Sequence, residues 1–293
     1  MNVFKLRQGE HGSQTLTAVS FHFATSKKFP WYQDRAGKIR HYAVCPECDN
    51  PIHIVNLDVD RKVDNEGRNL PLYAKHALGN IEGIGAFDPE AYEDCSLANP
   101  KSLNGADKTR RPGKVVSDIL EVLRDHADAL RYIIERFLGA SISDELYGSI
   151  LRQFHKQEGY LYRAVSTSNL PYSLLYMAGN QSTYGCFPKP ESVWTQALAH
   201  SAHFEMGKWG IRRKSDSKAQ LRFFVTDHEI KSSPDGHEQK MMLVVEEEYA
   251  GEKRRLLTKN QTMEIQFFRN MLSKRMRLRE IACKEFPACT DSK

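Results

Sequence analysis

Three cysteines and one histidine near the N-terminus have the residue types and the spacing of a metal site. Cys45-Pro-Glu-Cys48 places two thiols one tight turn apart, where both sulfurs can face one ion. Farther along, His76 lies in the segment LYAKHALG and Cys95 ends the segment DPEAYEDC. Zinc is usually bound by four thiolate and imidazole ligands in a tetrahedron. The sequence therefore predicts a structural zinc ion bound by Cys45, Cys48, His76 and Cys95.

The same residues allow other interpretations. A Cys-x-x-Cys can be a redox pair, although that motif needs a βαβ context and here two predicted strands flank it. The cysteines could also be unpaired, and His53 is an alternative ligand to His76, although it falls inside a predicted strand. With four protein ligands no coordination position stays open, so the ion would stabilise the fold and not catalyse.

The motif also resembles a known kind of module. A Cys-Pro-x-Cys after a strand, with a Lys-His downstream, is similar to the zinc-ribbon front ends of bacterial DNA-handling proteins, including the CoiA competence family. Cys45 to Cys48 and Lys75-His76 carry this resemblance. The remaining residues do not follow that pattern, so the resemblance is confined to this module.

Residues 1–98, which contain this motif, are expected to form a small β-rich module. Segments of β-branched and aromatic residues predict strands at Thr15–Ala24, Lys38–Val44 and Ile52–Leu57. A short helix is expected to begin at Asp88, because Asp is a favoured N-cap and Pro89 suits the first helical position. Residues 99–114 are rich in Pro, Gly, Asn and Lys/Arg without apolar periodicity, which predicts a linker.

Residues 115–293 are expected to form a larger domain of helices followed by a β-meander. Apolar spacing predicts one helix from Val115 to Leu138, which Gly139 ends. The other elements expected here are helices from Ser143, from Pro171 to Ala178, from Ser192 to about Met206 and from Met263 to Glu285, and strands at Gln220–Ile230, Lys240–Tyr249 and Arg254–Lys259. The whole chain is thus expected to be α+β, with a zinc-stabilised module, a helix-plus-meander domain and a basic C-terminal helix.

Positive charge is concentrated in a few segments. The formal net charge is +5, and between Glu252 and Lys284 ten Lys/Arg face three acids. Clustered cations beside aromatic residues are typical of proteins that contact phosphate and stack on bases, although a charged run is also common on a solvated helix face. The residues predicted to contact nucleic acid are Arg212, Arg213 and Lys214 beside Trp209, and Lys274, Arg275, Arg277 and Arg279, with Lys101, Lys108, Arg110, Arg111 and Lys114 adding charge in the linker.

Three groups are weak candidates for catalysis. Asp227, Glu229 and Lys231 have the residue types of a magnesium-dependent nuclease, but a polar hairpin end would look the same. His200 and His203, three residues apart, would share a helix face and with Glu205 could bind a metal or act as a general base. The alternative is that both imidazoles are packed in a helix with satisfied hydrogen bonds. A base-reading pocket would use tyrosines and amides, which also occur at core rims: Tyr160, Tyr162, Tyr172, Tyr176, Tyr184, Asn169, Asn180 and Gln181.

These observations lead to three hypotheses. The first is a DNA-binding protein with a structural zinc site. The second is an enzyme acting on DNA, either a nuclease or a base-excising glycosylase, and the third is an interaction module for an acidic protein. The sequence shows no secretion signal and no run of apolar residues that could span a bilayer, so we expect a cytoplasmic location and no membrane partner.

Overall fold

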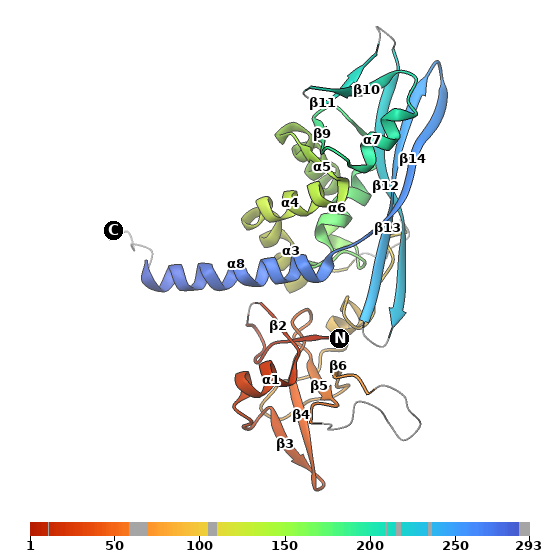
Figure 1. Ribbon diagram of the computed structural model, residues 1–293. Coiled ribbons are helices and arrows are strands. Elements are labelled where there is room, and N and C mark those ends of the chain that lie inside the picture. Colours follow the sequence, from red (N-terminus) through yellow and green to blue (C-terminus); the bar gives the residue numbers. More distant parts are fainter. Residues whose placement is uncertain are drawn as a thin grey trace, which may run out of the picture. The chain divides into compact units, whose positions relative to one another are not determined.

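The chain combines helices with several antiparallel sheets, which confirms the α+β class (Figure 1). The computed structural model describes residues 1–10, 12–58, 70–104, 110–208, 210–214, 218–233 and 236–286. Contacts divide the chain into two compact units. The first consists of Met1–Pro100, Ser232–His237 and Arg269–Lys293, and the second of Lys101–Lys231 and Glu238–Phe268. The first unit thus includes a C-terminal segment that the sequence analysis assigned to the larger domain.

A four-stranded antiparallel sheet forms the centre of the first unit. Its strand order is β3 (Tyr32–Arg35), β4 (Lys38–Val44), β5 (Pro51–Val55) and β6 (Tyr73–His76). The strands predicted at Lys38–Val44 and Ile52–Leu57 are confirmed as β4 and β5. Ile52 and Ile54 of β5 are fully buried and pack with Phe4 and Phe21 in one apolar cluster. Phe4 belongs to a short second sheet of β1 (Val3–Phe4) and β2 (Gln14–Thr15).

The strand predicted at Thr15–Ala24 is wrong, because most of this segment forms helix α1 (Ala18–Thr25). The hydroxyl of Thr17 accepts from the amide of Ser20 at 3.0 Å, and the hydroxyl of Ser20 accepts from the amide of Thr17 at 3.0 Å. This capping box satisfies two amides at the helix start and outweighs the strand preference of the aromatic and β-branched residues. The helix turns Phe21 onto Phe4, with ring centroids 5.2 Å apart.

The helix predicted from Val115 to Leu138 is two helices, α3 (Lys114–Asp125) and α4 (Ala127–Leu138). The break lies at His126, whose φ of −128° and ψ of 30° are not helical. His126 is buried, so the second unit packs against the break itself. The apolar period continues across this residue, and for that reason the sequence pattern did not reveal the break. Gly139 ends α4 in the left-handed conformation, as predicted.

Two further helix predictions are confirmed and one is partly wrong. Ser143 caps α5 (Asp144–Lys156), and α6 spans Leu170–Ala178. The helix predicted from Ser192 to Met206 is only seven residues long, α7 (Val193–Ala199). Its expected second half is strand β10 (Phe204–Gly207), which pairs with β11 (Gly210–Arg213) in a hairpin.

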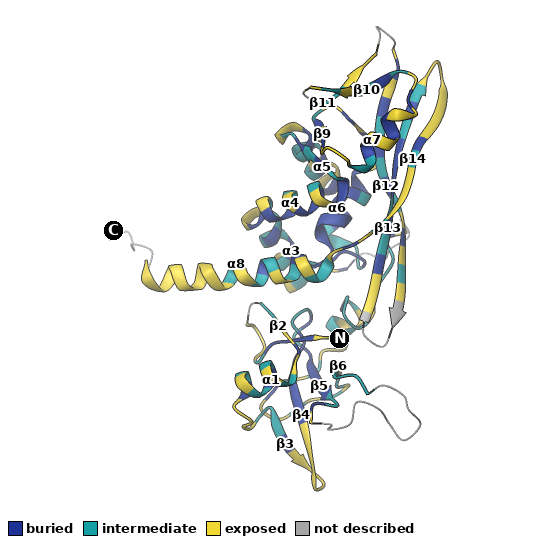
Figure 2. Cartoon of the chain, viewed as in Figure 1, coloured by how far each residue is buried: buried dark blue, intermediate teal, exposed yellow. Residues whose placement is uncertain are grey.

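The second unit contains the predicted meander. Its four-stranded sheet has the order β14 (Glu252–Thr262), β13 (Gly236–Tyr249), β12 (Gln220–Ser233) and β8 (Gln181–Ser182). Short elements complete the unit: β7 (Ala140–Ile142), β9 (Cys186–Pro188) and the 3₁₀ turn Gly159–Leu161. The predicted C-terminal helix is α8 (Ile265–Glu285), whose C-terminal turns are exposed (Figure 2). Within the described residues, no helix combines the length and the apolar character needed to cross a bilayer.

The capping box of α1 leads to a stability prediction. Replacing Thr17 with Ala removes the side-chain acceptor and is expected to lower the free energy of unfolding by about 1 kcal/mol. The conservative variant Thr17→Ser keeps the hydroxyl and should stay near the wild-type value. Urea unfolding followed by circular dichroism measures both, and equal stabilities of the two variants would argue against the capping role.

Candidate metal centre

The four predicted ligands come together in the first unit. The sulfurs of Cys45, Cys48 and Cys95 and a ring nitrogen of His76 all lie within 4.8 Å of one another. The Cys45 and Cys95 sulfurs are 3.7 Å apart, and Nε2 of His76 lies 3.3 Å from the Cys48 sulfur and 3.6 Å from that of Cys95. In the part of the chain that the structure describes, no other group of three or more His, Cys, Asp or Glu side chains is gathered in this way. The group could hold a metal ion.

Three separate segments bring these side chains together. Cys45 follows β4, and its amide donates to the carbonyl of Asn50 at 2.8 Å, which closes the tight turn that carries Cys48. Strand β6 ends at His76, which is paired with Ile52 of β5 and so lies beside this turn. Cys95 follows Asp94, which is the C-cap of α2 (Pro89–Glu93). The proximity of Cys45 to Cys48 depends on a local turn, whereas the positions of His76 and Cys95 depend on strand pairing and helix placement.

Asn50 connects the cysteine turn to α2. Its side-chain amide donates to the carbonyl of Asp88 at 2.9 Å and to the Cys48 sulfur at 3.4 Å, while its oxygen accepts from the Asp88 amide at 2.6 Å. Asp88 caps α2 as predicted, accepting from the amides of Glu90 and Ala91. The sequence analysis did not single out Asn50. The structure gives this buried amide a role in positioning Cys48 and, through α2, Cys95.

The thiols influence one another strongly. Hydrogen bonds from the thiols of Cys45 and Cys95 lower the pKa of Cys48 far below its ordinary value, with a further contribution from His76. Hydrogen bonds to the other two cysteines raise the pKa of Cys95, and burial raises that of Cys45. By themselves these sulfurs favour one shared negative charge. A divalent cation would allow all three to be thiolates, which is the form in which cysteine binds metal.

The surroundings fit a structural ion better than a catalytic one. Cys45, Cys48 and Cys95 are buried, His76 is partly buried, and four protein ligands leave no open position for a substrate. The alternative ligand His53 is not part of the group. It lies on β5 opposite Lys75, and its ring centroid is 5.5 Å from that of Tyr42, with the two rings tilted.

The cysteine turn also contacts the C-terminal helix. Glu47, between the two cysteines, lies 3.7 Å from the guanidinium of Arg269 on α8, and both side chains are about nine-tenths buried. Removing one partner of an ion pair with so little solvent access is strongly destabilising, because the other charge stays buried without it. The geometry of the metal group and the placement of this part of α8 are therefore connected.

The structure does not assemble the predicted catalytic groups. Asp227, Glu229 and Lys231 are exposed on β12, and Asp227 has a positive φ of 49°. His228 between them is buried, where its ring nitrogens contact the Gln239 oxygen at 2.9 Å and the Leu103 amide at 3.0 Å. Neither carboxylate belongs to a group that could hold a metal ion among the described residues.

The other two candidate groups are also dispersed. His200 lies just after α7 and His203 precedes β10, so the predicted common helix face does not exist. His203 stacks on Tyr249 instead, with centroids 4.4 Å apart. Among the tyrosines, Tyr172 is buried and its oxygen accepts from the Glu264 amide, whereas Tyr184 is exposed.

The predicted basic clusters have different environments. Arg212 pairs with Glu205 at 2.6 Å, and Lys214 donates to the carbonyl of Ser201 at 2.5 Å. Arg110 of the linker is buried and donates to three carbonyls, including that of Val165 at 2.8 Å. Its role is thus structural. Lys108 of the linker and the aromatic neighbour Trp209 lie outside the described residues.

Comparisons with protein-family models, with curated proteins and with solved structures find no match to this chain.

The cysteine cluster leads to a metal-content prediction. Purified protein is expected to contain one metal ion per chain, and Cys48→Ser is expected to lose it and to melt at a lower temperature. Cys283→Ser is the matched control, because Cys283 is exposed and lies outside the group. Elemental analysis and a thermal melt test both variants. A Cys48→Ser protein that keeps its metal and its melting temperature would refute the ligand set.

Proposed function

We propose that the protein binds DNA through phosphate contacts beside α8, within a unit whose fold a structural zinc ion stabilises. The observation that carries this proposal is a groove of about 620 Å³ in the first unit, on whose wall Lys274 and Arg277 have no acidic partner among the described residues. Cations without a protein partner remain available to neutralise phosphate. The groove is lined by Lys5, Glu10, Gly12, Ser13, Gln14, Asn270, Ser273, Lys274, Arg277 and Glu280.

Helix α8 and the strand that precedes it in the sequence, β14, both carry clustered cations. On β14, Lys253, Arg254 and Arg255 lie opposite Glu248, Glu247 and Glu246 of β13, and Lys253 lies 3.7 Å from Glu246. Helix α8 carries six Lys/Arg and two Glu, and its C-terminal turns are exposed (Figure 2). Arg254 and Arg255 are exposed as well, so the proposal selects α8 because Lys274 and Arg277 line a concave site.

The opposite wall of the groove is polar backbone and hydroxyl. The Ser13 amide donates to the Ser273 hydroxyl at 3.1 Å, and the two hydroxyls lie 3.3 Å apart. These bonds fix the loop before β2 against α8. Lys5 is already paired with Asp49, so it contributes less free charge than Lys274 and Arg277. Two glutamates at the rim, Glu10 and Glu280, would favour a phosphate position close to the helix cations.

Zinc is the metal that the ligand set supports best. Soft thiolate ligands with an imidazole select zinc over magnesium or calcium, which prefer oxygen. Because Glu47 of the cysteine turn pairs with Arg269 of α8, an intact metal site would also hold the helix in place. Zinc would then act on DNA affinity indirectly, through the position of the cations.

The proposal predicts a loss of affinity on charge reversal. The double variant Lys274→Glu, Arg277→Glu is expected to abolish or strongly weaken binding of a fluorescein-labelled DNA duplex at low salt. Wild-type affinity should fall steeply with salt, and the neutral variant Lys274→Gln, Arg277→Gln should reduce the slope of log K against log salt by about 2. Fluorescence anisotropy over a salt series measures both.

A charge-matched control separates a specific groove from general attraction. Lys38→Glu, Arg40→Glu makes the same change in net charge on exposed residues of β4 in the same unit. This variant should retain nearly wild-type affinity. Equal losses in both double variants, or a wild-type protein that binds no DNA at low salt, would overturn the proposal and favour an acidic protein as the partner of these cations.

A further inference from the structure

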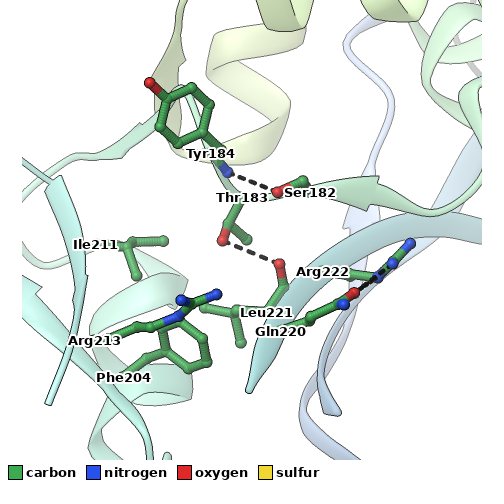
Figure 3. Close-up of a pocket in the computed structure, with 9 residues that line it drawn as sticks. All are labelled: Ser182, Thr183, Tyr184, Phe204, Ile211, Arg213, Gln220, Leu221 and Arg222. Atoms are coloured by element: carbon green, nitrogen blue, oxygen red, sulfur yellow. Dashed lines mark hydrogen bonds between the residues drawn. The ribbon is translucent and has the colours of Figure 1, made fainter. Parts of the chain in front are cut away.

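A second concave site lies in the second unit, remote in sequence from α8 (Figure 3). It has a volume of about 500 Å³, within the range of about 300–1,000 Å³ typical of small-molecule sites. Strands β8, β10, β11 and β12 and the turn after β8 supply its walls. The lining consists of Ser182, Thr183, Tyr184, Phe204, Ile211, Arg213, Gln220, Leu221 and Arg222.

The described residues of the lining carry positive charge and no carboxylate. The guanidinium of Arg213 lies over the ring of Phe204, with its carbon 6.0 Å from the ring centroid. Arg222 donates to the Gln220 side-chain oxygen through Nε at 3.1 Å and through a terminal nitrogen at 2.5 Å. Gln220 thus orients Arg222 without neutralising it. Figure 3 shows Arg213 within the site, whereas Arg222 extends away from it beside Gln220. The Arg213 guanidinium, with no carboxylate among the described lining residues, favours an anionic ligand.

A tyrosine projects at the rim of this site. Tyr184 is 88% exposed, although its backbone is tightly held. Its amide donates to the Ser182 hydroxyl at 3.1 Å, and both the amide and the hydroxyl of Thr183 donate to the Leu221 carbonyl at 3.1 Å. Gly185 follows with a φ of 80°, and a Cβ there would lie 2.4 Å from the Ser143 hydroxyl. An aromatic ring on such a fixed turn is available for stacking at little entropic cost.

We propose that this site binds one nucleotide of an unpaired nucleic-acid strand. The base stacks on Tyr184, the phosphate binds Arg213, and the hydroxyls and amide of the lining contact base or sugar. This inference rests on the proposed function in taking nucleic acid as the ligand, but it uses other residues in the other unit. A base inside a duplex cannot stack on a protein ring, so the site selects single strands.

The test measures binding of a short fluorescein-labelled oligodeoxythymidine by anisotropy at low salt. Tyr184→Ala is expected to weaken binding about tenfold, whereas Tyr184→Phe keeps the ring and should stay within about twofold of wild type. Phe23→Ala is the matched control, because Phe23 is an exposed aromatic of the first unit at 87% and has no part in the site. Thermal melts verify that each variant is folded.

Charge substitution and competition complete the test. Arg213→Gln should weaken binding of the oligomer and reduce its salt slope by about 1. Thymidine monophosphate should compete with the oligomer in the wild type but not in Tyr184→Ala. Unchanged affinity in Tyr184→Ala, or equal losses in Tyr184→Ala and Phe23→Ala, would overturn the inference. So would a wild-type protein that binds no single strand.

The two proposals fail in distinguishable ways. The double reversal at Lys274 and Arg277 should act on duplex binding and leave competition by thymidine monophosphate unchanged. Tyr184→Ala should leave the affinity for the duplex unchanged and lower the affinity for the single strand. Failure of the α8 groove with a Tyr184 effect intact therefore overturns only the first proposal, and the reverse pattern overturns only the second.

Discussion

The first unit brings three sulfurs and an imidazole nitrogen within 4.8 Å of one another, which is an electrostatic constraint on the segments that carry them. Burying several thiolates together is costly without a cation, and the opposed pKa shifts of Cys48 on one side and Cys45 and Cys95 on the other express that cost. The three cysteines belong to the same apolar cluster as Ile52 and Ile54. A cation at this point would add to the packing, strand pairing and Asn50 hydrogen bonds that already join the three segments.

The basic clusters seen in the sequence differ in whether their side chains already have acidic or carbonyl partners in the structure. The basic residues between 252 and 284 form one cluster along the sequence, yet β14 lies opposite the acidic stretch of β13 and α8 does not. Arg110 and Lys214 are similarly occupied with backbone carbonyls. Among the described cations, Lys274 and Arg277 line one groove, and Arg213 and Arg222 line another pocket. Each set lies beside groups suited to phosphate, and the second also beside an exposed ring.

The incorrect element predictions share a physical origin. At Thr17 the strand pattern of side chains conflicts with a local capping box, and the hydrogen bonds of the cap decide the outcome. At His126 the apolar period continues through a break that only the packing of the second unit produces. Beyond Ala199 a helical pattern gives way to the β10–β11 hairpin, because pairing with another strand is a long-range contact that periodicity does not record.

The sequence alone determined the elements governed by local chemistry. These are the strands at Lys38–Val44 and Gln220–Ile230, the helix starts at Asp88 and Ser143, the stop at Gly139 and the tight Cys45–Cys48 turn. It also indicated the metal ligands by type. Tertiary structure decided that His76 and not His53 joins them, that Asn50 supports Cys48, and that Asp227 and Glu229 join no metal-binding group among the described residues. Distances between residues far apart in sequence depend on which strands pair and which helices pack, and those choices minimise the free energy of the whole chain.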